Sequence, residues 1–104
     1  MFQTIMNLFK SELDEEIVSW IKDKAILIDV RSEKEFRTGY VAGSINIPLP
    51  ELRKQINKLN RKDRFVIYCR SGNRSGAAID LMKSHGFQYL KNGISWRLVD
   101  KALH

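Results

Sequence analysis

Two short apolar runs, Ala25–Val30 and Phe65–Tyr68, constrain the fold of this chain more than any other feature. The first is interrupted only by Asp29 near its end, and the second contains no charged residue. Neither run alternates between apolar and polar residues, as a strand with one face in water would. Both therefore suit central strands of a parallel sheet, in which helices cover both faces of each strand.

Helical patterns separate and surround these runs. Apolar residues recur in them at helical spacing, and Gly39 and Gly86 follow two of the patterns as natural stops. The sequence predicts helices at residues 12–23, 33–38, 49–59 and 75–85, a short helix after Gly93 that buries Trp96, and two further strands at residues 44–47 and 87–90. Strands that alternate with helices predict an α/β fold with a mainly parallel sheet. The ligand site of such a sheet lies at the carboxyl ends of its strands, where Asp29 and Cys69 are expected.

The length of 104 residues suffices for one domain with one core, and we expect residues 1–104 to form a single domain. Apolar residues make up 43% of the chain, which is typical of a globular protein. The formal net charge of +6 favours anionic partners. The basic residues are spread along the chain, however, and there is no RNA-binding aromatic motif, zinc-finger spacing or basic-region heptad. We therefore expect no nucleic-acid partner.

Cys69 is the only cysteine, so the chain can form neither an internal disulfide nor a cysteine-rich metal site. A lone thiol fits a reducing compartment. Residues 1–10 are too polar for the core of a signal peptide, and no apolar stretch approaches the length that spans a membrane. We expect a cytoplasmic protein without a membrane anchor, a metal ion or another cofactor, and we expect a monomer.

Cys69 occupies a position where a thiol is expected to be reactive. It follows the second apolar run and opens a polar loop that leads into the helix predicted from Ser75. Backbone N–H groups of the loop can turn inward, the helix adds its positive end, and Arg70 and Arg74 add two charges, all of which favour the thiolate. The alternative is a buried cysteine that acts as a small hydrophobic residue, but residues 70–75 are far too polar for a core.

The same loop is suited to binding an anion. Gly72 permits the left-handed backbone conformation that a closed ring of N–H groups requires, and Asn73 tolerates it. Phosphate-binding loops use such rings, and here the ring would hold an anionic substrate beside Cys69. The sequence leaves open which of Arg70 and Arg74 faces that substrate.

The loop Cys69–Ser75 resembles the active-site loop of single-domain rhodaneses, which are sulfurtransferases. Two further motifs match in order along the chain. The first comprises Asp29-Val30-Arg31, Glu35-Phe36, Gly39-Tyr40-Val41, Gly43-Ser44 and Asn46-Ile47-Pro48, and the second comprises Gly86-Phe87, Leu90, Gly93 and Trp96. The resemblance covers about residues 11–98, and three ordered motifs are more specific than one. Tyr40 and Asn92 depart from it, because the family often has histidine and glycine at these positions.

The resemblance implies a fold, a reaction and a set of site residues. The fold is rhodanese-like, an α/β fold with a five-stranded parallel sheet flanked by helices on both sides. The reaction is that of a thiosulfate sulfurtransferase (rhodanese), in which the Cys69 thiolate takes sulfur from thiosulfate or another anionic sulfane-sulfur donor. The resulting persulfide passes the sulfur to cyanide or a thiol. The residues that would hold substrate and persulfide are Arg70, Ser71, Gly72, Asn73, Arg74 and Ser75, and those that would support the loop are Asp29, Arg31 and Glu35.

Two alternatives to a free-standing sulfurtransferase remain open. The first is a persulfide carrier or a docking module for a partner protein, and a carrier differs from a free-standing enzyme only in the molecule that takes the sulfur. Because the chain has one cysteine, enzyme and carrier alike need an external acceptor. A cysteine phosphatase or arsenate reductase would need an arginine after five intervening residues. Arg74 follows Cys69 after four, which makes a smaller ring that suits a single sulfur better than a phosphate.

Overall fold

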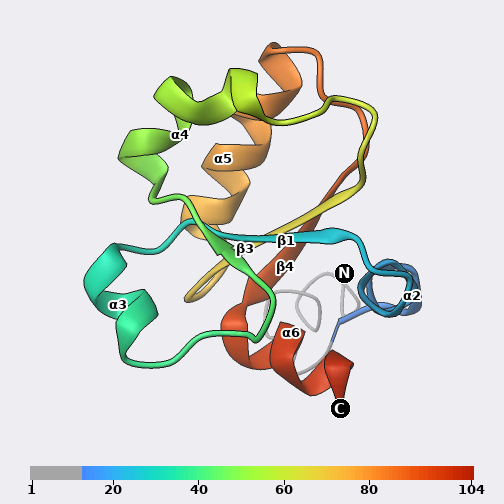
Figure 1. The fold of residues 1–104 in the computed structure, drawn as a ribbon. Helices are drawn as coiled ribbons and strands as arrows, with labels where there is room; N and C mark the ends of the chain where they lie inside the picture. The colour runs from blue at the N-terminus through green and yellow to red at the C-terminus, as the bar shows by residue number, and fades with distance from the viewer. Residues whose placement is uncertain (1–12) are drawn as a thin grey trace, which may run out of the picture.

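Helices cover both faces of a parallel sheet in the computed structural model, which describes residues 13–104 (Figure 1). Along the chain the elements are α2 (Glu15–Lys22), β1 (Ile26–Asp29), α3 (Glu33–Arg37), β2 (Ile45–Asn46), α4 (Leu49–Gln55), the 3-10 helix η1 (Ile56–Lys58), β3 (Phe65–Cys69), α5 (Asn73–Ser84), β4 (Leu90–Ser95) and α6 (Trp96–Leu103). This alternation confirms the predicted α/β fold. Residue 12, at which the sequence predicts the first helix to begin, lies outside the described residues, and the helix is seen from Glu15 onwards.

The sheet has the strand order β2–β1–β3–β4, and all neighbouring strands are parallel. The two apolar runs form its central pair, in which Leu27 lies beside Val66 and Asp29 beside Tyr68. Every residue of β3 is buried, as expected for a strand that is covered on both faces. Among residues 13–104 the sheet contains four strands, so the expected number of five is wrong for this part of the chain.

The last strand lies further along the chain than the sequence predicts. Phe87 does not begin it but turns into the core, where it packs edge-on against Phe65 with 5.7 Å between the ring centroids. The backbone N–H of Phe87 donates to the carbonyl of Met82 and closes the end of α5. Gly86, with a φ of 90°, provides the left-handed residue that this helix end requires, as predicted. The strand therefore begins at Leu90.

Two apolar clusters flank the sheet. On one face, Ile67 of β3 packs with Leu52 of α4 and Met82 of α5. On the other face, Val66 of β3 packs with Val99 of α6 and with residues of α2. Figure 1 shows the same division, with α4 and α5 on one side of the sheet and α2 and α6 on the other. No helix within residues 13–104 combines the length and the apolar character that crossing a membrane requires.

The two central strands end side by side, and both predicted strand-end residues lie there. Asp29 ends β1 and Cys69 ends β3. Beyond Cys69 the chain turns through Gly72, whose φ of 102° is favourable only for glycine. Helix α5 begins directly after it at Asn73, earlier than the predicted start at Ser75. The second half of the predicted loop is therefore the first turn of a helix.

Candidate active site

Cys69 is buried at the base of the loop that follows β3. The residue is 1% exposed, and three polar groups lie around its Sγ atom. The backbone N–H of Gly72 donates to Sγ at 3.1 Å, the hydroxyl of Ser75 lies 3.4 Å away, and the carbonyl oxygen of Ile94 lies 3.7 Å away. The chain thus folds back onto the sulfur within three residues, with a backbone donor directed at it.

The environment of Cys69 changes the acidity of its thiol. Burial raises the pKa, because the charged thiolate loses contact with water. Hydrogen bonds from the hydroxyl and N–H of Ser75, and from the N–H groups of Ser71 and Gly72, act in the opposite direction. Together these donors outweigh burial, so the pKa of the thiol lies below its ordinary value. A larger fraction of the group is then thiolate at neutral pH, and the thiolate is the form in which a cysteine can act as a nucleophile.

A buried ion pair occupies the end of β1. Asp29 is fully buried, Arg31 is 4% exposed, and the guanidinium donates to both carboxylate oxygens at 2.7 and 3.0 Å. The backbone N–H of Arg31 donates to the same carboxylate at 2.9 Å, and its guanidinium also reaches the carbonyl of Gly39 at 2.6 Å. These two predicted supporting residues therefore bind each other and anchor the turn at Gly39.

Glu35 connects α3 to the Cys69 loop. Both of its carboxylate oxygens accept hydrogen bonds from the Arg74 guanidinium, at 2.6 and 2.9 Å. Such a bidentate, charge-assisted pair is stronger than a neutral hydrogen bond. The bond to Arg74, with smaller contributions from Ser32, lowers the pKa of Glu35 to about 2 in spite of partial burial. The guanidinium of Arg74 is thus engaged by a neighbouring helix.

The Glu35–Arg74 pair is expected to make the free energy of unfolding depend on pH in acidic solution. Its contribution is complete above the ordinary glutamate pKa of 4.5 and is lost as the pH falls from 4.5 toward 2, where Glu35 is protonated in the folded protein. The melting temperature of the wild type should therefore fall more steeply over this interval than that of Glu35→Gln. Parallel curves for the two proteins would show that the pair does not stabilise the fold.

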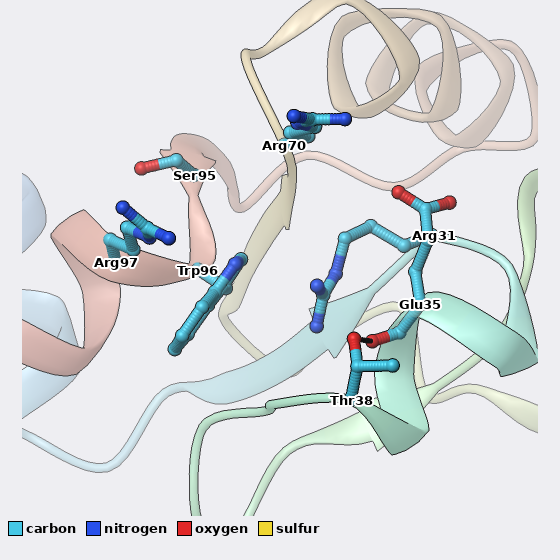
Figure 2. A pocket seen from close by; sticks show the side chains of 7 residues that line it. All are labelled: Arg31, Glu35, Thr38, Arg70, Ser95, Trp96 and Arg97. Atoms are coloured by element: carbon cyan, nitrogen blue, oxygen red, sulfur yellow. Dashed lines mark hydrogen bonds between the residues drawn. The ribbon is translucent and has the colours of Figure 1, made fainter.

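A cavity of about 460 Å³ opens next to the loop (Figure 2). It is lined by Arg31, Glu35, Thr38, Arg70, Ser95, Trp96 and Arg97. Arg70 follows Cys69 in the chain, and Ser95 is the residue that pairs with Cys69 between β3 and β4. The cavity therefore begins at two direct neighbours of Cys69, one along the chain and one across the sheet.

The two loop arginines lie in different surroundings. Arg70 is exposed and lines the cavity, whereas Arg74 lines a second hollow between α3 and α4. Of the other predicted loop residues, Ser71 and Asn73 are exposed and Ser75 is fully buried. Arg70 is thus the loop arginine whose side chain can meet a ligand in the cavity.

Trp96 lies at the cavity, although the sequence predicts a core position for it. Strand β4 continues to Ser95, so Trp96 is the first residue of α6 and remains half-buried. The indole packs against the apolar cluster beneath α6 and also lines the cavity. The guanidinium carbons of Arg31 and Arg97 lie 5.5 and 5.4 Å from its ring centroid. Figure 2 shows the indole between these two arginines.

Asn92 makes contacts with the loop that the sequence does not predict. Its Oδ1 accepts hydrogen bonds from the Ser75 hydroxyl at 2.7 Å and from the N–H of Ile94 at 2.8 Å, and its Nδ2 donates to the carbonyl of Gly72 at 3.2 Å. It therefore joins β4 to the turn and to the first helical turn beside Cys69. One feature of the sequence singles out this residue: Asn92 occupies a position where the rhodanese family, which the chain resembles, often has glycine.

Asn92 and Cys69 are expected to compete for the hydrogen of the Ser75 hydroxyl, because a hydroxyl has only one hydrogen to donate. Asn92→Gly should lower the pKa of Cys69 and Ser75→Ala should raise it, each read as the midpoint of the pH profile of alkylation by iodoacetamide. In the double variant the effect of Asn92 should vanish. An equal effect of Asn92→Gly with and without the Ser75 hydroxyl would contradict this competition.

The charged groups of the site favour an anion over a cation. Within residues 13–104 no three His, Cys, Asp or Glu side chains are placed to hold a metal ion. The carboxylates of Asp29 and Glu35 are each bound by an arginine. The remaining cationic side chains at the cavity therefore suit an anionic ligand.

Comparison with known proteins identifies relatives over most of the chain. The sequence model of the rhodanese-like domain matches residues 13–96. Among curated proteins, "Putative sulfur carrier protein YrkF" of Bacillus subtilis is 33% identical over 87 residues, which cover 84% of this chain and 44% of that protein. "Thiosulfate sulfurtransferase PspE" of Escherichia coli is 33% identical over 67 residues, which cover 62% of this chain and 64% of that protein.

Solved structures share the fold. The human single-domain sulfurtransferase TSTD1 superposes with a TM-score of 0.71 at 27% identity, over 86% of this chain and 94% of that protein. A rhodanese with anions from E. coli superposes with a TM-score of 0.67 at 28% identity, over 72% of this chain and 91% of that one. The chain spans about half the length of the curated relatives that it matches, with shares of 44%, 55% and 64% for three of them.

Proposed function

This chain belongs to the rhodanese-like domain family, and from that premise we propose that it is a sulfurtransferase that carries the transferred sulfur on Cys69. The observation that supports this most is the arrangement at Sγ, with the Gly72 N–H at 3.1 Å and the Ser75 hydroxyl at 3.4 Å. These groups favour a thiolate. They also suit the negative charge of a persulfide that extends from the same atom.

In the proposed first step, the Cys69 thiolate attacks the outer sulfur of thiosulfate. The bond between the two sulfurs of thiosulfate breaks, and its electron pair leaves with sulfite. Cys69 then carries a persulfide whose negative charge lies on the outer sulfur. No proton has to move in this step, so it needs no general base. Both histidines, His85 and His104, follow the C-terminal ends of α5 and α6, at the far ends of helices that begin beside the site.

Thiosulfate is the proposed donor, on the strength of the E. coli relative's name and of the cationic cavity. Arg70→Gln is expected to raise the KM for thiosulfate about tenfold, which is the usual effect of losing one charge-assisted hydrogen bond. The KM for a neutral organic trisulfide should change little. The matched control is Arg53→Gln, an exposed arginine of α4 that does not line the cavity. Equal effects of Arg70→Gln on the two donors would contradict a contact with the donor's charge.

A sulfur carrier is the second candidate function. It is favoured by the single cysteine of the sequence, which provides no internal thiol to take the sulfur, and by the name of the Bacillus subtilis relative. The persulfide on Cys69 is common to both functions, and the acceptor distinguishes them. Fast discharge to cyanide favours the free-standing enzyme, whereas slow discharge to cyanide with fast transfer to a protein thiol favours the carrier.

A cysteine phosphatase has less support. Its chemistry requires an arginine that grips a tetrahedral oxyanion, and Arg74, the arginine in the corresponding part of the loop, is bound by Glu35. Hydrolysis of p-nitrophenyl phosphate by a protein that is inert toward thiosulfate would favour the phosphatase.

The proposed function is tested by the intact mass of the protein after brief incubation with thiosulfate, with Cys69→Ala measured beside it. We expect a gain of one sulfur atom that cyanide reverses and that the variant lacks. A protein that gains no sulfur from thiosulfate or from polysulfide would contradict the proposal. A gain that persists in Cys69→Ala would place the sulfur elsewhere.

A further inference from the structure

Ile94 of β4 adopts a backbone conformation that its own side chain makes costly. Its φ of 69° lies in the left-handed region. In this region Cβ of an L-residue crowds the following carbonyl oxygen, and the branched side chain of isoleucine adds to the crowding. Residues in such conformations persist where the surrounding structure holds them, and they cluster at functional sites.

The pairing of β4 with β3 holds Ile94 in this conformation. Ile94 pairs with Tyr68, the residue that precedes Cys69. A shift of register just before this pair leaves Gly93 as an extra residue on β4. An extra residue of this kind is a β-bulge, which bends its strand and redirects the neighbouring side chains. Ile94 is therefore the redirected residue nearest to the sulfur.

The side chain of Ile94 covers one side of Gly72, in the turn that follows Cys69. A Cβ added to Gly72 would lie 3.4 Å from Cγ2 of Ile94 and 3.8 Å from its Cα. Ile94 therefore borders the space in which a side chain of residue 72 would stand. Cγ2 is one of the two branches on Cβ, so a group that makes the left-handed conformation costly is also the group that reaches the turn.

Gly72 is a residue whose orientation needs such support. Its N–H donates to Sγ of Cys69 at 3.1 Å, and its φ is 102°. Because glycine has no Cβ, its own backbone restricts its rotation less than that of any other residue. Ile94 lies on one side of Gly72, and its carbonyl oxygen also lies 3.7 Å from Sγ. Ile94 thus contacts both the donor residue and the sulfur.

We infer that Ile94 is a positioning residue for Cys69, because its Cγ2 methyl group holds Gly72 with its N–H directed at the sulfur. The effect of Ile94 on the reaction rate rests on the proposed sulfur transfer, whereas its effect on the thiol does not. Ile94 packs against the apolar cluster of α2 and α6, and Cys69 belongs to the cluster on the other face of the sheet. Loss of the methyl group therefore weakens the N–H contact and leaves the apolar residues that bury the sulfur in place.

The inference is tested by the midpoint of the pH profile of alkylation by iodoacetamide, measured for wild type, Ile94→Val and Ile94→Ala. Valine keeps both methyl positions on Cβ and should leave the midpoint unchanged. Alanine removes them and should raise the midpoint by about one unit, as expected when a hydrogen bond to a charged group is weakened. Neither variant changes a charge, and Arg74, which interacts with the charge of Cys69, stays in place.

The matched control is Ile17→Ala, the same substitution in the apolar cluster against which Ile94 packs. Ile17 lies on α2, so this variant should lower the melting temperature without moving the midpoint. An Ile94→Ala variant with lower stability and an unchanged midpoint would overturn the inference, since Ile94 would then only stabilise the fold. Equal shifts of the midpoint in Ile94→Ala and Ile17→Ala, or in Ile94→Ala and Ile94→Val, would also overturn it.

Ile94→Gly tests the left-handed conformation in solution. Glycine ordinarily destabilises a strand relative to alanine, but at a positive φ it avoids the crowding of Cβ. Ile94→Gly should therefore melt at a higher temperature than Ile94→Ala and share its raised midpoint. The opposite order of melting temperatures would show that residue 94 is not held in this conformation, which would remove the basis of the inference.

The proposed sulfur transfer adds a kinetic measurement. Single-turnover loading by thiosulfate is followed by intact mass at a pH below both midpoints. At saturating thiosulfate Ile94→Ala should load about threefold more slowly, because an about tenfold smaller thiolate fraction is partly offset by a more nucleophilic thiolate. The half-saturating concentration should not change, since Ile94 does not line the cavity. A change in that concentration alone would overturn the inference by assigning Ile94 to donor binding. If the proposed function fails, the wild type gains no sulfur, and the alkylation midpoints still decide the role of Ile94.

Discussion

Replacing Cys69 with serine is expected to reduce sulfur transfer below detection while the protein stays folded. A serine hydroxyl is not ionised by donors that suffice for a thiol, and its oxygen does not form the sulfur–sulfur bond that stores the transferred atom. The side chains are close in size, so the buried site should accept the change. Formation of thiocyanate from thiosulfate and cyanide gives the activity, and the thermal unfolding curve gives the state of the fold.

The comparison variant for Cys69→Ser is Cys69→Ala. It removes the polar atom that contacts the Gly72 N–H and the Ser75 hydroxyl, so it shows whether packing around these donors affects the result. Both variants should be inactive and folded. Undiminished turnover in either variant would show that Cys69 takes no part in the reaction.

Replacing Asp29 with alanine is expected to cause the largest loss of stability. Arg31 is 4% exposed, and Asp29 accepts hydrogen bonds from both its guanidinium and its backbone N–H. Removal of one partner from a buried ion pair leaves the other charge without compensation, which typically costs about 3–5 kcal/mol. Urea denaturation should show this loss in the free energy of unfolding.

The double variant Asp29→Ala/Arg31→Met identifies the cause of that loss. When both members of a buried pair are apolar, no charge is left without a partner, and much of the stability should return. A double variant no more stable than Asp29→Ala would show that the shape of the carboxylate, rather than its charge, supports the turn at Gly39.

The parts of the fold that local sequence determines were predictable. The two apolar runs became the central strands, because burial on both faces leaves no alternation of polar residues. Gly86 ended α5 in the left-handed conformation that helix ends favour. The second run also predicts that Cys69 lies at the end of β3, so the position of the proposed nucleophile in the sheet follows from local sequence.

The features that depend on tertiary contacts were not predictable. β4 passes through a change of register beside β3, and Ile94 adopts a φ of 69°, which is unusual for a β-branched residue. Gly93 is required just before it, because an added Cβ would lie 2.7 Å from a methyl carbon of Val99 and 2.9 Å from one of Val66. This path carries the strand past the predicted end and brings Trp96 to the cavity.

The pairing of Glu35 with Arg74 is likewise a tertiary contact that local sequence does not predict. The two are 39 positions apart, and nothing in their local sequence selects one among the chain's many possible ion pairs. Both could be nominated as site residues from the resemblance to rhodaneses. Only the structure shows that they bind each other, which leaves Arg70 at the cavity.

The sulfur of Cys69 is attached to the most enclosed strand of the sheet. β3 is paired on both sides, by β1 and β4, and all of its residues are buried. Amide hydrogens of such a strand exchange with deuterated solvent only when the whole domain opens. We therefore expect β3, which carries the sulfur, to have no local opening that requires less free energy than unfolding of the whole domain. On heating, the protein should keep its proposed sulfurtransferase activity until the cooperative unfolding transition and lose activity and fold together, without a preceding inactive folded form.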